Sequence, residues 1–198
     1  GSAGYGRLSA KNNWTNISRV LGTGRISNGG GQNNFNSKGL IGGLHVGIQK
    51  FVTPTIRIGG EIYGFFQAHK ASVSAGTRSE SLKRENGGGI KTKAGYLFDT
   101  HSSVYAHLGV EKAGFKYTVS EGIAGTSKKY LWGMPFGIGI ETSLGCKWTA
   151  RVEYTHIIYQ KWKTKERLVD SNVVAILASK TKISPSQDSI VLGVSYTF

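Results

Sequence analysis

The chain has 198 residues, of which 29 are glycine and only 3 are proline, and its formal net charge is +14. This length predicts a single domain over residues 1–198, and so little proline argues against a disordered proline-rich segment. The longest apolar run, Val173 to Ala178, has six residues, whereas a membrane helix needs about 20. If the chain crosses a membrane, it must therefore do so with strands that pair in a closed sheet.

The first predicted element is a strand at about residues 3–11, in which Gly4, Gly6, Leu8 and Ala10 alternate only weakly. Three hairpins follow, each with apolar residues at every second position and a turn of five residues between its strands. Alternation with period two is typical of a strand with one apolar face. The predicted strand, turn and strand are 40–48, 51–55 and 56–66 in the first hairpin, 90–98, 99–103 and 104–110 in the second, and 132–140, 143–147 and 148–154 in the third.

Long polar connections separate these elements, at about residues 12–37, 70–87, 117–130 and 162–187. Together with a closing strand at about 188–198, the pattern predicts eight strands, with three short turns at one end and four long loops at the other. This asymmetry is typical of outer-membrane barrels, whose turns are periplasmic and whose long loops are extracellular. A soluble sandwich or lipocalin-like barrel would also alternate, and it is the main structural alternative.

The closing strand is the most regular of all, with apolar residues at every second position up to Phe198. In an outer-membrane barrel such a strand pairs with the first, and its last aromatic residues, here Tyr196 and Phe198, lie at the membrane interface. Aromatic residues near both ends of the strands predict two interfacial belts. The predicted belt near the turns is Tyr96, Phe98, Trp148, Tyr196 and Phe198, and the one near the loops is Tyr117, Tyr130, Trp132, Tyr159 and Trp162.

The hairpin plan, the turn asymmetry and the terminal Phe198 resemble the small eight-stranded outer-membrane proteins of Gram-negative bacteria, the opacity-protein-like surface antigens and their relatives. The resemblance covers essentially the whole chain. It implies an all-β, antiparallel, up-and-down transmembrane barrel in the bacterial outer membrane, and an adhesive or membrane-stabilising role. It also implies that the barrel assembly machinery recognises the closing strand through Tyr196 and Phe198.

Charged residues on the polar strand faces predict a neutral barrel interior. Four positive and four negative side chains fall there, and buried charges must be paired or hydrogen-bonded. A salt-bridged polar plug is the expected result, with a narrow water or ion path along inward glycines as the alternative. The predicted network is Arg57, Lys91, Lys93 and Arg151 with Glu61, Glu111, Glu141 and Glu153.

The four long connections carry most of the net positive charge. Such a field attracts polyanions and weakens with salt. The expected partners are outer-membrane lipid, the phosphates of lipopolysaccharide, and acidic glycans or acidic surface proteins of a host; no nucleic-acid motif is evident. The candidate binding residues are Arg19, Arg25, Lys128, Lys129, Lys163, Lys165, Arg167, Lys180 and Lys182.

Catalytic and metal sites are not indicated by the sequence. Lipid A-modifying enzymes occur on this architecture and need a nucleophile beside a base, but His156 is followed by Ile157 and Ile158 rather than by a serine. His69, near Ser72 and Ser74, is a weaker candidate. No Cys/His spacing suits a metal, and the lone Cys146 forms no internal disulfide.

These observations predict a monomeric surface protein that is not an enzyme, has no cofactor, and binds acidic glycans or lipopolysaccharide. A small pore for ions or solutes is the first alternative function. A lipid A-modifying enzyme is the second.

Overall fold

The computed structural model describes residues 1–20, 26–67, 69–75, 78–120, 125–145, 147–170 and 175–197. No helix within these ranges is long and apolar enough to span a membrane. The described residues form ten strands: β1 (Ser2–Val20), β2 (Ile26–Phe51), β3 (Ile56–Gln67), β4 (His69–Ala75), β5 (Arg78–Leu97), β6 (Ser102–Ser120), β7 (Gly125–Gly145), β8 (Trp148–Tyr159), β9 (Trp162–Asp170) and β10 (Ala175–Tyr196).

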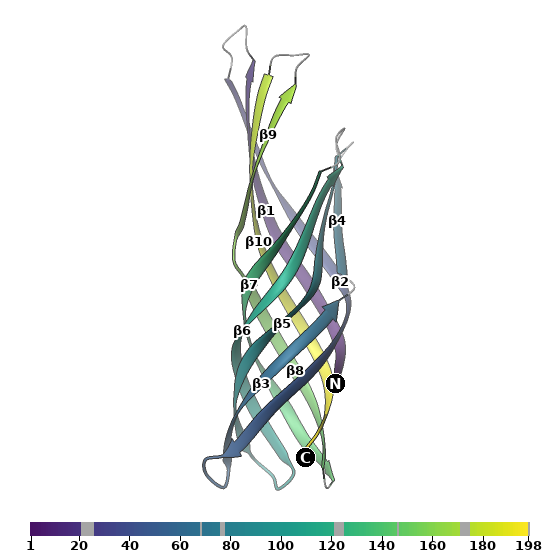
Figure 1. Cartoon of the computed structure of the whole chain (residues 1–198), viewed down its shortest axis with the longest axis vertical. Helices are drawn as coiled ribbons and strands as arrows, with labels where there is room; N and C mark the ends of the chain where they lie inside the picture. The colour runs from purple at the N-terminus through teal and green to yellow at the C-terminus, as the bar shows by residue number, and fades with distance from the viewer. Residues whose placement is uncertain are drawn as a thin grey trace.

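Eight of these strands close a ring in the order β1, β2, β3, β5, β6, β7, β8, β10 and back to β1 (Figure 1). All the pairings are antiparallel, and the closing pair runs from Ser2 opposite Gly193 to Val20 opposite Ala175. β4 continues β3 along the same neighbour, β5, and β9 continues β8 along β10. The predicted eight-stranded antiparallel barrel is therefore confirmed.

Large apolar side chains cover the outer face of the barrel. On β2, Leu44, Val46 and Ile48 are 69%, 70% and 82% exposed, and the other strands show the same outward set. A continuous apolar surface of this kind is unfavourable in water and favourable against lipid. The outer face is thus the lipid-facing surface of a transmembrane barrel, as predicted, and a soluble barrel is excluded.

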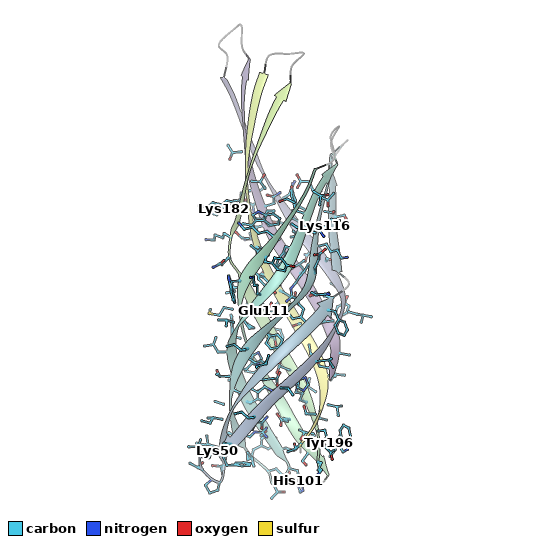
Figure 2. The ribbon with its side chains drawn as sticks, in the orientation of Figure 1. Lys50, His101, Glu111, Lys116, Lys182 and Tyr196 are labelled. Carbon is cyan, nitrogen blue, oxygen red and sulfur yellow. The ribbon has the colours of Figure 1, made fainter. Side chains whose placement is uncertain are left out.

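The aromatic belts are only partly as predicted. At the loop end Tyr130 and Trp132 do face outward, but Tyr117, Tyr159 and Trp162 are buried in the interior. The prediction was wrong for these three because they occupy inward positions of β6, β8 and β9, where they pack on other interior rings. At the turn end Phe198 lies outside the described residues, and the other four predicted aromatic side chains, Tyr96, Phe98, Trp148 and Tyr196, are exposed. Figure 2 labels Tyr196 at this end of the barrel.

The strands are longer than the alternation predicted and continue into the segments expected to be loops. Above the apolar surface they separate into two sheets, which Figure 1 shows rising with β9 on one side and β4 on the other. We call them the β9 arm and the β4 arm. The β9 arm comprises residues 11–20, 26–40, 162–170 and 175–183, and the β4 arm comprises 69–75, 78–87, 112–120 and 125–132. Near the barrel the inward face of these extensions carries apolar side chains such as Phe35 and Tyr117. Polar residues are frequent elsewhere along both faces, so a long apolar alternation does not reveal these strands.

The barrel interior holds two layers. The layer nearer the turns is charged, and the layer nearer the arms is a cluster of buried apolar side chains in which the rings of Phe115 and Tyr159 meet edge to face, 5.0 Å apart. Interior side chains of this kind fill a small barrel rather than leaving a pore. The apolar cluster is formed by Leu8, Ala10, Phe35, Ile41, Phe65, Leu82, Ala113, Phe115, Tyr117, Leu131, Ile157, Tyr159, Trp162 and Ile183.

Candidate functional site: the interior network and the basic outer surface

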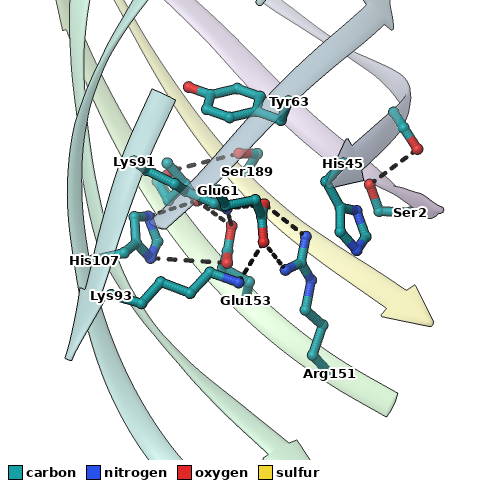
Figure 3. A network of polar contacts seen from close by, with 12 residues as sticks. Ser2, His45, Glu61, Tyr63, Lys91, Lys93, His107, Arg151, Glu153 and Ser189 are labelled. Atoms are coloured by element: carbon teal, nitrogen blue, oxygen red, sulfur yellow. Dashed lines mark hydrogen bonds and ion pairs between the residues drawn. The ribbon is translucent and has the colours of Figure 1, made fainter. Parts of the chain in front are cut away.

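Glu61 on β3 is the centre of the charged layer (Figure 3). Its carboxylate accepts hydrogen bonds from Lys93 Nζ at 2.5 Å and from Arg151 Nη1 at 2.6 Å, and Lys91 Nζ lies 3.3 Å from it. The three cations come from β5 and β8. They reach one carboxylate because inward side chains of a narrow barrel converge on its axis.

Glu153 on β8 is the second carboxylate of this layer. It pairs with Lys91 Nζ at 2.6 Å and accepts a hydrogen bond from the Tyr105 hydroxyl at 2.8 Å. His107 lies beside it, with Nδ1 3.8 Å from the carboxylate. Lys91 therefore links the two carboxylates into one network that crosses the lumen.

Two further pairs extend the charged layer in opposite directions. Arg57 and Glu141 lie 3.2 Å apart toward the turns. Toward the arms, Glu111 pairs with Arg84 at 2.7 Å and accepts hydrogen bonds from the hydroxyls of Tyr63 and Tyr159. The eight residues named from the sequence thus all lie inside the barrel, but Glu111 belongs to a separate pair with a cation that the sequence interpretation had placed in a loop.

Arg84 and Glu80 are the interior charges that the sequence interpretation missed. Both are almost fully buried, at 1% and 2% exposure, and Glu80 accepts a hydrogen bond from Asn12 Nδ2 at 3.1 Å. The signal was hidden because the β5–β6 register shifts between Arg84 and Gly87, which interrupts the alternation. With them included, five cations and five carboxylates lie inside the barrel among the described side chains, and their charges balance.

The inward glycines make room for these side chains. A Cβ added at Gly139 would lie 2.5 Å from the Tyr105 ring, and one at Gly193 would lie 2.8 Å from Arg151 Nε. Between the charged and apolar layers lies a cavity of about 80 Å³, lined by residues that include His45, His107 and Arg151. Its lining is mixed, with apolar side chains such as Phe65 and Ile157 beside these polar groups, and its volume is enough for a few water molecules hydrogen-bonded to the polar ones.

The predicted basic residues are distributed over both arms. Lys128 and Lys129 on β7, Lys163 on β9 and Lys182 on β10 are exposed. Arg25 lies outside the described residues. Arg19, Lys165, Arg167 and Lys180 lie on described strands, but the structure does not describe their side chains.

Further exposed cations lie at and above the upper edge of the apolar surface. On β6, the Lys112 Nζ lies 5.6 Å from the Tyr130 ring and 5.5 Å from the Trp132 ring. On β1, Arg7 Nε donates a hydrogen bond to Asn36 Oδ1 at 2.8 Å. The other exposed or half-exposed cations on this side of the barrel are Lys11, Lys38, Lys83, Lys116 and Lys161.

Few carboxylates oppose these cations. Among the side chains that the structure describes, only Glu85 and Asp188 lie partly exposed on this side of the barrel. Glu85 is 4.0 Å from Lys128, and Asp188 accepts a hydrogen bond from the Tyr154 hydroxyl at 2.7 Å and contacts His156 Nδ1 at 2.7 Å. Within the described part of the chain, no group of three or more His, Cys, Asp or Glu residues could hold a metal ion.

A family model described as the outer membrane protein beta-barrel domain matches residues 2–198. The chain belongs to this family. Membership places the barrel in the bacterial outer membrane and agrees with the lipid-facing surface described above. No curated protein matches the chain.

Solved structures with similar folds include the outer-membrane protease OmpT of Escherichia coli, at 12% identity and a TM-score of 0.52, covering 100% of this chain and 96% of that one. OprG of Pseudomonas aeruginosa has 10% identity and a TM-score of 0.48, covering 98% and 96%. Ail, the attachment invasion locus protein of Yersinia pestis, was solved with the heparin analogue sucrose octasulfate; it has 8% identity and a TM-score of 0.36, covering 94% and 98%.

The likeness to OmpT corrects one prediction. The chain was expected not to be an enzyme, because His156 is followed by Ile157 and Ile158 rather than by a serine and His69 is only a weak candidate for a catalytic base. That expectation was wrong, since a fold that spans this whole chain also carries a protease. At this identity the likeness is one of fold alone, so it assigns no reaction to this barrel.

Proposed function

We propose that this outer-membrane barrel binds polyanions that bear phosphate or sulfate groups, through the basic surface above its apolar band. The observation that carries this proposal is the segregation of charge. Among the side chains that the structure describes, the five cations and five carboxylates of the interior cancel, and the remaining cations are exposed or half-exposed. A surface with this bias attracts polyanions at long range.

The basic surface has cations at the membrane interface, which suit lipopolysaccharide, and cations farther from the membrane, which suit sulfated glycans or other polyanions. Lys112 sits between Tyr130 and Trp132, two aromatic side chains of the kind that lie at a membrane interface. A cation at that depth would meet the phosphates of lipopolysaccharide. Lys128 and Lys129 stand farther along β7 and would meet sulfated glycans or other polyanions beyond the membrane.

Binding of lipopolysaccharide and of heparin to the purified full chain, measured over a range of salt concentrations, tests the proposal. Both should bind, and both should weaken as salt rises because exposed charges are screened. Lys112→Gln should weaken lipopolysaccharide binding more than heparin binding, and the pair Lys128→Gln with Lys129→Gln should do the reverse.

Lys50→Gln is the matched control, because Lys50 is also an exposed lysine on a strand but lies at the opposite, turn end of the barrel (Figure 2). It should leave both affinities unchanged. Binding that is indifferent to salt, or equally sensitive to Lys50→Gln, would refute a site on the arm side.

A further inference from the structure

The barrel wall opens between β7 and β9. The last main-chain hydrogen bond that joins β7 to the segment after β8 runs from the Gln160 N–H to the Trp132 carbonyl, at 2.9 Å. Farther from the membrane β7 pairs only with β6, and β9 pairs only with β10, among the residues that the structure describes. Two strand edges therefore face each other without joining, on the two arms that separate in Figure 1.

The residues of β7 whose N–H and C=O groups point away from β6 can be identified from the alternating geometry of the strand. Successive residues of a strand direct their N–H and C=O groups to opposite sides. Because the Trp132 carbonyl points toward β8, the main-chain groups of Tyr130, Lys128 and Thr126 point the same way, into the opening. All three side chains are exposed. This edge thus presents a row of donors and acceptors outside the ladder with β6.

Lysines surround the opening. Lys128 and Lys129 on β7, with Lys161 and Lys163 at the start of the β9 arm, are exposed. Among the described side chains Glu85 lies 4.0 Å from Lys128 and forms a weak surface pair with it. Edge lysines discourage pairing with a second copy of the same chain, and the net charge of +14 on each copy adds to this repulsion. The same lysines would attract a strand with acidic side chains.

We propose that an extended acidic peptide segment of a partner protein adds as a strand to the β7 edge at Thr126, Lys128 and Tyr130. Main-chain hydrogen bonds from the edge would supply affinity, and the flanking lysines would select acidic side chains. The proposal goes beyond polyanion binding, since it requires main-chain pairing and not charge alone.

The test uses the full chain in lipid nanodiscs and a synthetic peptide of alternating glutamate and valine. Lys128→Gln and Lys128→Pro remove the same charge, but only the proline also removes the N–H that points into the opening. That N–H is not used by the β6 ladder, so an edge proline is compatible with the strand. The proline variant should bind the peptide about fivefold more weakly than the glutamine variant, as expected for one lost hydrogen bond.

Two further measurements distinguish strand addition from polyanion binding. A peptide N-methylated at alternate residues keeps its charge but loses main-chain donors, and it should bind the protein much more weakly than the unmethylated peptide. Heparin should bind the Lys128→Gln and Lys128→Pro variants with equal affinity. Thr126→Pro repeats the test if Lys128→Pro fails to fold. Equal peptide affinities for the proline and glutamine variants, or full binding of the methylated peptide, would overturn strand addition in favour of simple charge attraction.

Discussion

Replacing Glu61 by glutamine is the sharpest test of the interior network. Glu61 is 6% exposed and receives Lys93, Arg151 and Lys91 within 3.3 Å. Glutamine has nearly the same shape but no charge, so three buried cations would face Glu153 as their remaining carboxylate in this layer. Breaking a buried pair by removing one partner costs about 3–5 kcal/mol. We expect the free energy of unfolding to fall by about that amount.

The assay is urea unfolding of the barrel in lipid vesicles, followed by tryptophan fluorescence. Glu85→Gln is the control, since the Glu85 side chain is 35% exposed and its lysine partner lies 4.0 Å away; such surface pairs are worth about 0–1 kcal/mol. Glu61→Gln combined with Lys93→Met should recover part of the loss. If Glu61→Gln unfolds at the same urea concentration as Glu85→Gln, the network does not stabilise the barrel and the reasoning fails.

Three other predictions follow from the packed interior. Gly139→Ala should destabilise by about 1–3 kcal/mol, because its Cβ would lie 2.5 Å from the Tyr105 ring; Gly60→Ala, with nothing within 4 Å of its Cβ, should be neutral or slightly stabilising in the same urea assay. Phe115→Ala should cost about 3–5 kcal/mol, since Phe115 is 1% exposed in the apolar layer, and a loss below 1 kcal/mol would contradict that packing. In planar bilayers the filled lumen should give no stable unit conductance, and regular current steps would show that the two layers open.

The sequence predicted those features that depend only on the alternation of successive strand residues between the outer and inner faces of the barrel. Alternation identified the lipid-facing side chains, and the positions between them placed Glu61, Lys91 and Arg151 inside. It did not predict which carboxylate meets which cation, because partners such as Glu61 and Arg151 lie on β3 and β8, far apart in the chain. The alternation also failed to predict the inward position of Arg84, because the register between β5 and β6 shifts between Arg84 and Gly87.

The opening between β7 and β9 is the feature that sequence reasoning was least able to anticipate. Residues 162–170 alternate no more clearly than a polar loop, and nothing in this short stretch shows on which side it pairs. What separates the arms is the interruption at Gln160 and Lys161, after which β9 follows β10 and leaves β7. Four exposed lysines, Lys128, Lys129, Lys161 and Lys163, thus lie on the segments next to the place where the closed sheet ends. A ligand that reaches this place would meet both lysines and unpaired main-chain groups, which is why the Lys128→Gln and Lys128→Pro pair can separate the two contributions.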